Sequence, residues 1–236
     1  MSRARIAVLA SGGGSNLQAL LDHLAALGAG RAADVVLIAS DRADAGALER
    51  GRRAAVRVET LASTRHPEGA SLDALLDRRS IDLVVLAGYL RLIPAEITRR
   101  FPGRMLNVHP APLPQFGGPG MYGARAHRAV LAARAPMSGA TVHFVDEVYD
   151  HGAVIAHWPV PVLASDDEHA LAARVLRAEH LLFPRVVQAV AAGTIRLDAD
   201  GVLAGPSTPL ASTLPTFDPE LDDASLAKLL DRALAS

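Results

Sequence analysis

Apolar segments alternate with helical segments along the first half of the chain, and this alternation constrains the fold most. The first apolar run, residues 5–10, leads directly into the glycine-rich segment 11–16, after which leucines recur at helical spacing. Strands joined through helices form right-handed βαβ units in a parallel sheet. The strands expected on this basis cover residues 5–10, 35–39, 56–58, 82–87 and 105–109. The sequence therefore predicts an α/β, Rossmann-like fold, with a mostly parallel twisted sheet and helices on both faces.

The second half changes from this alternation to a hairpin. A helix is expected over about 124–133, and residues 140–145 then alternate in polarity before an acidic turn. A second apolar strand is expected over 154–162. Two strands joined by a turn indicate an antiparallel edge on the parallel sheet.

The C-terminal third begins with the longest predicted helix. A capping box at Ser165–Glu168 opens it, it ends near Gly193, and Pro184 should kink or divide it. A last hairpin is expected over 194–203. We divide the chain into a catalytic domain at 1–203 and a C-terminal tail at 204–236, because the tail is rich in Pro, Ser and Thr before a short final helix.

Composition excludes several kinds of chemistry. The chain has 236 residues, is 50% hydrophobic and carries a net charge of -1, which gives no argument for nucleic-acid or membrane partners. It has no cysteine, and Lys228 is its only lysine, so thiolate, Walker-lysine and Schiff-base chemistry are excluded from the body. The apolar run at 6–10 is too short for a signal peptide. We expect a cytoplasmic protein whose partners are small-molecule substrates.

The segment Ser11–Asn16 is the first candidate binding site. A glycine-rich turn between a strand and a helix exposes backbone N–H groups where the helix dipole favours an anion such as a phosphate. It is not a dinucleotide fingerprint, because Leu17 stands at the place of the third glycine, and it is no P-loop, because the lysine is missing. A structural turn with Ser15 or Asn16 as the helix N-cap is the alternative.

The segment Met105–Pro114 is the candidate catalytic site. If its first half is a strand, the two-residue period places Asn107 and His109 on the same face at the strand's end. The prolines that follow end the strand and force a loop. An amide that donates and an imidazole that holds a proton near neutral pH can together stabilise an oxyanion. A purely structural histidine is the alternative.

Asp150, in the acidic turn of the hairpin, is the candidate third member of this site. A carboxylate near His109 would raise the pKa of the imidazole, fix its tautomer, and receive the proton of an attacking amine. No nucleophilic side chain is then required, because transfer between two bound substrates rests on placement and oxyanion stabilisation. No His-Glu-x-x-His spacing occurs, so we expect no metal.

Two further segments have open interpretations. The apolar loop 88–93, whose only charge is Arg91, either lines the pocket of a flat heterocycle or is a connector. Glu179, in the middle of the longest predicted helix, is either solvated, which is the default, or faces a ligand. The sequence does not decide whether His127 or His143 joins the site.

Seven short motifs in a fixed order resemble the phosphoribosylglycinamide formyltransferase family over roughly residues 5–200. Each motif is modest alone, and their order makes the resemblance specific. They are Ser-Gly-Gly-Gly-Ser-Asn-Leu at 11–17, Ser-Asp-Arg-Ala-Asp-Ala at 40–45, Leu-Ala-Gly-Tyr-Leu-Arg-Leu-Ile at 86–93, Asn-Val-His-Pro-Ala-Pro-Leu-Pro at 107–114, Thr-Val-His-Phe-Val-Asp at 141–146, Tyr-Asp-His-Gly at 149–152 and Ala-Glu-His at 178–180.

The resemblance implies a formyltransferase fold and a reaction of purine synthesis. The co-substrate would be 10-formyltetrahydrofolate, whose formyl group passes to the amine of 5'-phosphoribosylglycinamide, and a homodimer is one expected assembly. The implied catalytic trio is Asn107, His109 and Asp150. The residues implied in binding phosphoribosylglycinamide are Gly14, Ser15, Asn16 and Glu179. Those implied in binding the formylfolate are Leu90, Arg91, Leu92, Ile93, Asn107, Val145, Asp146 and Asp150.

The chain departs from the family pattern in three places. The segment Gln115–Gly123 is longer and richer in glycine, which changes the folate contacts expected there. Ala111 stands where serine is usual, a change that keeps the turn and loses one hydroxyl. The family's arginine before the third helix has no clean match, and Arg65 and His66 are its nearest counterparts.

Other members of the same fold provide the alternatives. A formyltetrahydrofolate hydrolase is similar around Asn107 and His109, but such enzymes usually carry a regulatory domain before the catalytic one. Methionyl-tRNA formyltransferase needs a basic C-terminal domain, whereas residues 204–236 carry only Lys228 and Arg232 as cations. A non-catalytic ligand-binding module is the alternative from another class.

Overall fold

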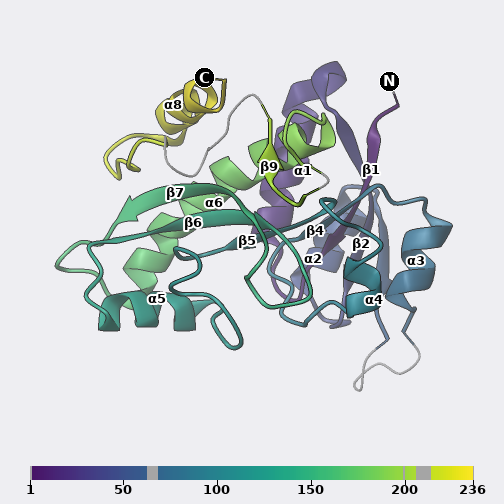
Figure 1. Ribbon diagram of the computed structural model, residues 1–236, viewed down its shortest axis with the longest axis horizontal. Helices are drawn as coiled ribbons and strands as arrows, with labels where there is room; N and C mark the ends of the chain where they lie inside the picture. Colours follow the sequence, from purple (N-terminus) through teal and green to yellow (C-terminus); the bar gives the residue numbers. More distant parts are fainter. Residues whose placement is uncertain (1, 63–68, 199, 206–213, 236) are drawn as a thin grey trace.

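A seven-stranded, mostly parallel sheet forms the centre of the protein (Figure 1). The computed structural model, which describes residues 2–62, 69–198, 200–205 and 214–235, gives the strand order β3-β2-β1-β4-β5-β6-β7. The strands from β3 to β5 are parallel, and β6 and β7 are antiparallel, so the predicted fold and its edge hairpin are confirmed. The strands are β1 (Ala4–Leu9), β2 (Ala33–Ser40), β3 (Arg57–Thr60), β4 (Leu83–Leu86), β5 (Met105–His109), β6 (Met137–Phe144), β7 (Val154–Pro161) and, in a separate antiparallel pair, β8 (Arg196–Leu197) and β9 (Leu203–Ala204).

Helices cover both faces of the sheet (Figure 1). Alternate residues of β1 point to opposite faces, as Ile6 lies in a core with α1, α2 and α6 whereas Ala7 lies in a core with α3 and α4. Burial on both faces explains why these strands are continuous apolar runs. The helices are α1 (Ser15–Leu27), the 3-10 helix η1 (Gly28–Gly30), α2 (Gly46–Arg53), α3 (Leu72–Arg78), α4 (Ala95–Thr98), α5 (Ala124–Ala132), α6 (Glu168–Ala191) and α8 (Asp223–Ala235).

The start of α1 differs from the sequence expectation. Its N-cap is Gly14, with φ 75° and no side-chain hydrogen bond, whereas Ser15 and Asn16 both lie inside the helix. A left-handed backbone at this position is accessible to glycine at little cost. The side chain of Asn16 is therefore not used as a cap.

The longest helix, α6, begins later than expected, whereas α1 begins earlier. Its N-cap is Asp167 instead of Ser165, and the Asp167 carboxylate accepts hydrogen bonds from the N–H groups of His169 and Ala170. Pro184 is buried and does not divide the helix, contrary to one of the two outcomes expected. Packing of the apolar face of α6 against the sheet stabilises the helix across this residue.

Residues 214–235 pack on β7 and α6. Phe217 is 1% exposed and lies edge-on to Trp158 of β7, with 5.3 Å between the ring centroids. Leu226 and Leu230 of α8 belong to the larger core, and the expected short final helix is confirmed. The hairpin β8–β9 lies across the boundary drawn after residue 203, and the division of the chain stays a prediction.

The sheet topology decides where a ligand can bind. The carboxyl ends of β1, β4 and β5 meet at one edge, where open α/β sheets bind their ligands. The antiparallel register of β5 and β6 places His143 opposite Asn107. Among the described residues, no helix has the length and apolar character needed to cross a membrane.

Candidate active site

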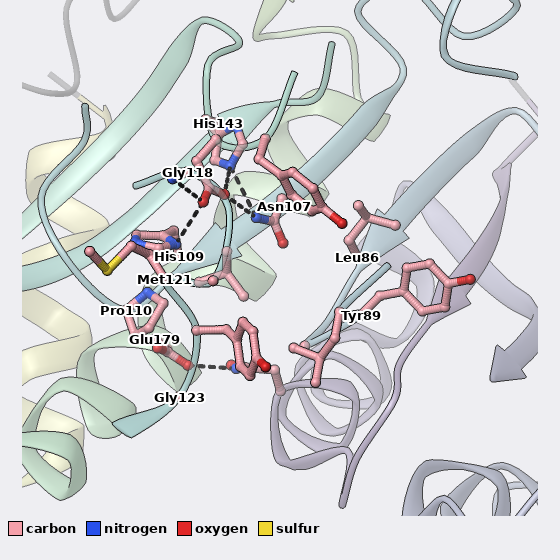
Figure 2. A pocket seen from close by; sticks show the side chains of 18 of the residues that line it. Leu86, Tyr89, Asn107, His109, Pro110, Gly118, Met121, Gly123, His143 and Glu179 are labelled. Carbon is pink, nitrogen blue, oxygen red and sulfur yellow. Dashed lines mark hydrogen bonds and ion pairs between the residues drawn. The ribbon is translucent and has the colours of Figure 1, made fainter. Parts of the chain in front are cut away.

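A cavity of about 530 Å³ lies beyond the carboxyl ends of β4 and β5 (Figure 2). Its walls come from the loop after β4, the end of β5, the loop before α5, the turn between β6 and β7, and α6. Most of the predicted site residues, although far apart in sequence, line this one cavity. They are Asn16, Leu90, Arg91, Leu92, Ile93, Asn107, His109, Val145, Asp146, Asp150 and Glu179.

Asn107 is held between two polar partners at the end of β5, as Figure 2 shows. Its Nδ2 atom lies 3.1 Å from Nε2 of His143 and 3.4 Å from Oδ1 of Asp150. Nδ1 of His143 lies 2.7 Å from the carbonyl oxygen of Phe144, so Nδ1 carries the proton and Nε2 accepts from Asn107. The amide is thereby fixed with its donor group toward Asp150.

His109 is buried against the loop that follows β5. Its Nε2 lies 2.8 Å from the carbonyl oxygen of Phe116 and donates to it, which leaves Nδ1 facing Oδ2 of Asp150 at 3.5 Å. Burial lowers the pKa of His109 and outweighs the carboxylate of Asp150, which raises it. The expected net increase in this pKa is therefore wrong. The imidazole is neutral at neutral pH, and Nδ1 is available to take a proton.

Asp150 sits in the turn between β6 and β7 with φ 54°, a conformation uncommon for residues other than glycine. Its Oδ2 accepts a 2.9 Å hydrogen bond from the N–H of Gly118. A Cβ atom at Gly117 would lie only 2.9 Å from the Cβ of Asp150, so the glycines of this loop make room for the carboxylate. Burial raises the pKa of Asp150, but its contacts with His143 and His109 and the hydrogen bond from the N–H of Gly118 lower it overall, and the group stays ionised.

Asn16 and Glu179 form a second polar pair, on the other side of the cavity (Figure 2). Nδ2 of Asn16 donates a 2.6 Å hydrogen bond to Oε2 of Glu179, which is only 6% exposed. The default expectation of a solvated Glu179 is therefore wrong. Burial raises the pKa of Glu179 to about 7, with the hydrogen bond from Asn16 acting in the opposite direction. Oδ1 of Asn16 is buried and has no hydrogen-bond partner among the described residues.

The loop after β4 supplies an apolar wall. The N–H of Leu90 donates to Oγ of Ser11 over 3.0 Å, and this hydroxyl donates to Asp41 over 2.7 Å, which ties the loop to the end of β1. Leu90 and Leu92 are about half exposed, whereas Ile93 is buried. Leucines at the mouth of a cavity suit a flat aromatic ring, which favours the pocket interpretation of this loop.

Among the described residues, two predicted site positions do not line the cavity. Gly14 and Ser15 lie at the start of α1, next to Asn16, but they form no part of the cavity wall. Arg65 and His66 lie outside the described residues, so neither is placed.

In the parts of the chain that the structure describes, no cluster of three His, Cys, Asp or Glu side chains could hold a metal ion.

Two histidines that the sequence left undecided line the cavity. His143 contacts Asn107 directly, and it could have been found only by pairing β6 with β5 in the correct register. His127 of α5 is 4% exposed, and its Nδ1 has no hydrogen-bond partner within the described residues. Burial lowers the pKa of His127 to about 4, and the proximity of the His109 imidazole acts in the same direction. Tyr89, in the loop 88–93, and Met121, in the glycine-rich segment 115–123, also line the cavity.

Comparison with known proteins agrees with this geometry. The family of formyl transferases matches residues 4–187. A protein of Arabidopsis thaliana named phosphoribosylglycinamide formyltransferase, chloroplastic, is 42% identical over 205 residues, which are 85% of this chain and 70% of that protein. The chain belongs to the phosphoribosylglycinamide formyltransferase family.

Other family relatives differ from this chain in length. The human trifunctional purine biosynthetic protein adenosine-3 is 37% identical over 203 residues, which are 84% of this chain but only 19% of that protein. The crystal structure of glycinamide ribonucleotide transformylase 1 from Symbiobacterium toebii matches with a TM-score of 0.74 at 38% identity, over 84% of this chain and 92% of that chain. A formyltetrahydrofolate deformylase from Pseudomonas syringae is 20% identical with a TM-score of 0.74, which shows a shared fold alone.

Proposed function

We propose that this protein transfers the formyl group of 10-formyltetrahydrofolate to the amine of 5'-phosphoribosylglycinamide. The observation that carries the proposal is the position of Asn107, His109 and Asp150. They lie together in one cavity, with the Asn16–Glu179 pair on one side and the apolar loop 90–93 on the other. A transferase without a nucleophilic side chain needs this arrangement, because both substrates must meet at the reacting groups.

The chemistry follows from the hydrogen bonds of the trio. The amine attacks the formyl carbon, and the carbonyl oxygen becomes an oxyanion. Asn107 is the proposed donor, since its 3.4 Å contact with Asp150 is long enough for a ligand oxygen to replace it. The bond from the formyl carbon to the folate nitrogen then breaks, and that nitrogen takes a proton.

The amine proton needs an acceptor at neutral pH. With Nε2–H of His109 bonded to Phe116, Nδ1 and the ionised Asp150 are two acceptors that face each other at 3.5 Å. A proton placed between them removes this repulsion, so the pair accepts the amine proton and can return it to the leaving nitrogen. We propose this relay in place of a His109 that is protonated beforehand, because burial lowers its pKa.

The two sides of the cavity suit the two substrates. We propose that Gly14, Ser15, Asn16 and Glu179 hold the ribonucleotide, since the turn offers N–H groups to a phosphate and the buried carboxylate accepts from hydroxyl groups. We propose that the formylfolate contacts Leu90, Arg91, Leu92, Ile93, Val145 and Asp146, together with Asn107 and Asp150. Both sets meet at the trio.

The test is a formyl-transfer assay with purified protein, both substrates, and each substrate omitted in turn. Formylated product should form only when both are present. Release of formate that continues without the ribonucleotide, and without a formylated product, would support the hydrolase. No consumption of the formylfolate under any condition would support a binding module.

We propose a cytoplasmic protein that acts as a homodimer on small molecules, without a metal and without nucleic-acid or membrane partners. The near-zero net charge supports the absence of nucleic-acid and membrane partners, and amine attack on a formyl group requires no metal in the scheme above. The Arabidopsis relative is named as a chloroplastic protein, so fractionation should test cytoplasm against plastid. Sedimentation of the purified protein decides the assembly.

A further inference from the structure

We infer that Arg50 of α2 is a positioning residue for the glycine-rich turn: it orients and polarises the peptide groups whose N–H bonds hold the substrate's phosphate. The inference rests on the proposed function, because it assigns a role within the same site. Arg50 itself contacts the turn from behind and does not line the cavity.

The contacts of α2 with the turn are specific. Nε of Arg50 donates a 2.7 Å hydrogen bond to the carbonyl oxygen of Gly13, and Nη1 donates to Oε1 of Gln18 in α1 over 3.1 Å. The backbone N–H of Ala47 donates to the carbonyl oxygen of Gly12 over 3.1 Å. Two successive carbonyl groups of the turn are therefore bound by α2.

These contacts decide where the turn's donors point. In a trans peptide the C=O and N–H bonds point in opposite directions. With the carbonyls of Gly12 and Gly13 turned to α2, the N–H groups of Gly13 and Gly14 point away from it. A carbonyl that accepts from a cation also polarises its own peptide, so the N–H of Gly14 becomes a stronger donor.

Close packing keeps this arrangement rigid. A Cβ atom on Gly14, whose φ is +75°, would lie 2.8 Å from Cα of Ala47. A Cβ atom on Gly46 would lie 3.2 Å from Cα of Gly13. Backbones that approach this closely leave the Arg50 guanidinium little freedom to reach its two acceptors in any other way.

A second observation points to a ligand at this turn. Asn16, in the first turn of α1, is 9% exposed and lines the cavity, and its Oδ1 atom is buried without a partner among the described residues. An unpaired buried oxygen is costly unless a ligand donor reaches it. The turn directly precedes Asn16 in the chain, so a ligand that reaches this oxygen from the cavity also comes near the polarised N–H groups of the turn.

The test compares Arg50→Gln, Arg50→Lys and the control Arg53→Gln. Arg53 is on the same helix, its side chain is 76% exposed, and it pairs only with Glu49 among the described residues.

Loss of a charge-assisted contact should raise KM for phosphoribosylglycinamide about tenfold in Arg50→Gln. The kcat and the KM for 10-formyltetrahydrofolate should stay within about twofold, since Arg50 touches neither the trio nor the apolar loop. Arg50→Lys should recover only part of the loss, because an ammonium group cannot make both bonds in the guanidinium geometry. Arg53→Gln should behave as the wild type.

A second readout does not depend on turnover. Inorganic phosphate is titrated into the wild type and Arg50→Gln while the amide resonances of Gly14 and Ser15 are followed by NMR. Weaker binding in Arg50→Gln, with thermal unfolding unchanged, supports the inference even if the wild type transfers no formyl group and the proposed function fails. Equal phosphate affinity, full recovery by Arg50→Lys, or an equal fall of all kinetic constants with a lowered unfolding temperature would overturn it.

Discussion

The relation between His109 and Asp150 illustrates how two buried groups share one proton. Each lies at the border of the cavity, and each is held by a backbone group of the same loop, the carbonyl of Phe116 for His109 and the N–H of Gly118 for Asp150. The pKa of each is lowered, because burial removes water from the imidazole while its neighbours stabilise the carboxylate. Before the reaction, His109 and Asp150 therefore have no proton between them, and the attacking amine can supply one.

We expect His109→Ala to lower kcat/KM by about a thousandfold, which is typical of a lost acid–base group. Binding of phosphate should be largely retained, because Asn16 and the glycine-rich turn are on the other side of the cavity. Steady-state kinetics, phosphate titration and thermal unfolding measure the three quantities. Unchanged turnover in this variant would contradict the relay.

Glu179 makes stability depend on pH. Its pKa is raised from the ordinary glutamate value of 4.5 to about 7, because the protonated form is favoured by burial. The stability that this preference provides is fully present below pH 4.5 and is lost as the pH rises to about 7. By linkage the loss is on the order of 3 kcal/mol, and it stays constant above that range.

Glu179→Gln tests this dependence, because the amide cannot ionise. The free energy of unfolding of the wild type, relative to the variant, should fall between pH 4.5 and about 7 and then level off. Urea unfolding of both proteins across roughly pH 4 to 8 measures it. Parallel pH profiles for the two proteins would show that the pKa of Glu179 is the same in the folded and the unfolded state, and would contradict the raised value.

At the scale of the element, the glycine-rich turn depends on the helix behind it. Gly14 has φ +75° and packs against Ala47, whereas Gly12 has no atom within 4 Å of its ideal Cβ position. Both residues precede α1, but only one is constrained by α2. Substituting each glycine in turn therefore distinguishes the effect of losing a glycine from the effect of a clash with α2.

Gly14→Ala should lower the free energy of unfolding by about 1 to 3 kcal/mol, because the methyl group meets α2 and the backbone is left-handed. It should also weaken phosphate binding, since the turn must shift. Gly12→Ala is the matched control and should change the unfolding free energy by less than about 0.5 kcal/mol. Denaturant unfolding of both variants provides the measurement, and equal losses would contradict the role of α2.

At the scale of the whole molecule, the C-terminal residues complete the core. The family match ends at residue 187, yet Phe217 is buried against Trp158, and the guanidinium of Arg177 lies 5.3 Å from the Phe217 ring centroid. The indole N–H of Trp158 donates to the carbonyl oxygen of Pro215 over 2.9 Å. These contacts join the end of the chain to β7 and α6, and α6 also carries Glu179.

Phe217→Ala should therefore cost about 3 to 5 kcal/mol of unfolding free energy, as buried aromatic truncations do. Leu229→Ala in α8 is the control, because Leu229 is 37% exposed, and it should cost less than about 1 kcal/mol. Urea unfolding compares the two. A small effect at Phe217 would show that this segment does not contribute to the cooperative core.

Local patterns along the chain were sufficient for most of the fold. Strand and helix periods, and glycine and proline positions, predicted the parallel sheet, its antiparallel hairpin and the short final helix. The α1 cap was missed, because Gly14 takes a left-handed conformation against α2. Division of α6 at Pro184, one of the two outcomes expected, does not occur, because packing against the sheet stabilises the helix there.

The sequence by itself determined the strand that delivers Asn107 and His109 to a loop, the glycine-rich turn and the family. Only the tertiary structure decided that His143 pairs with Asn107, that Glu179 is buried beside Asn16, and that the pKa of His109 is lowered. The physical reason is that periodicity depends on neighbours within a few residues, whereas strand register and desolvation depend on residues 36 and 163 positions away.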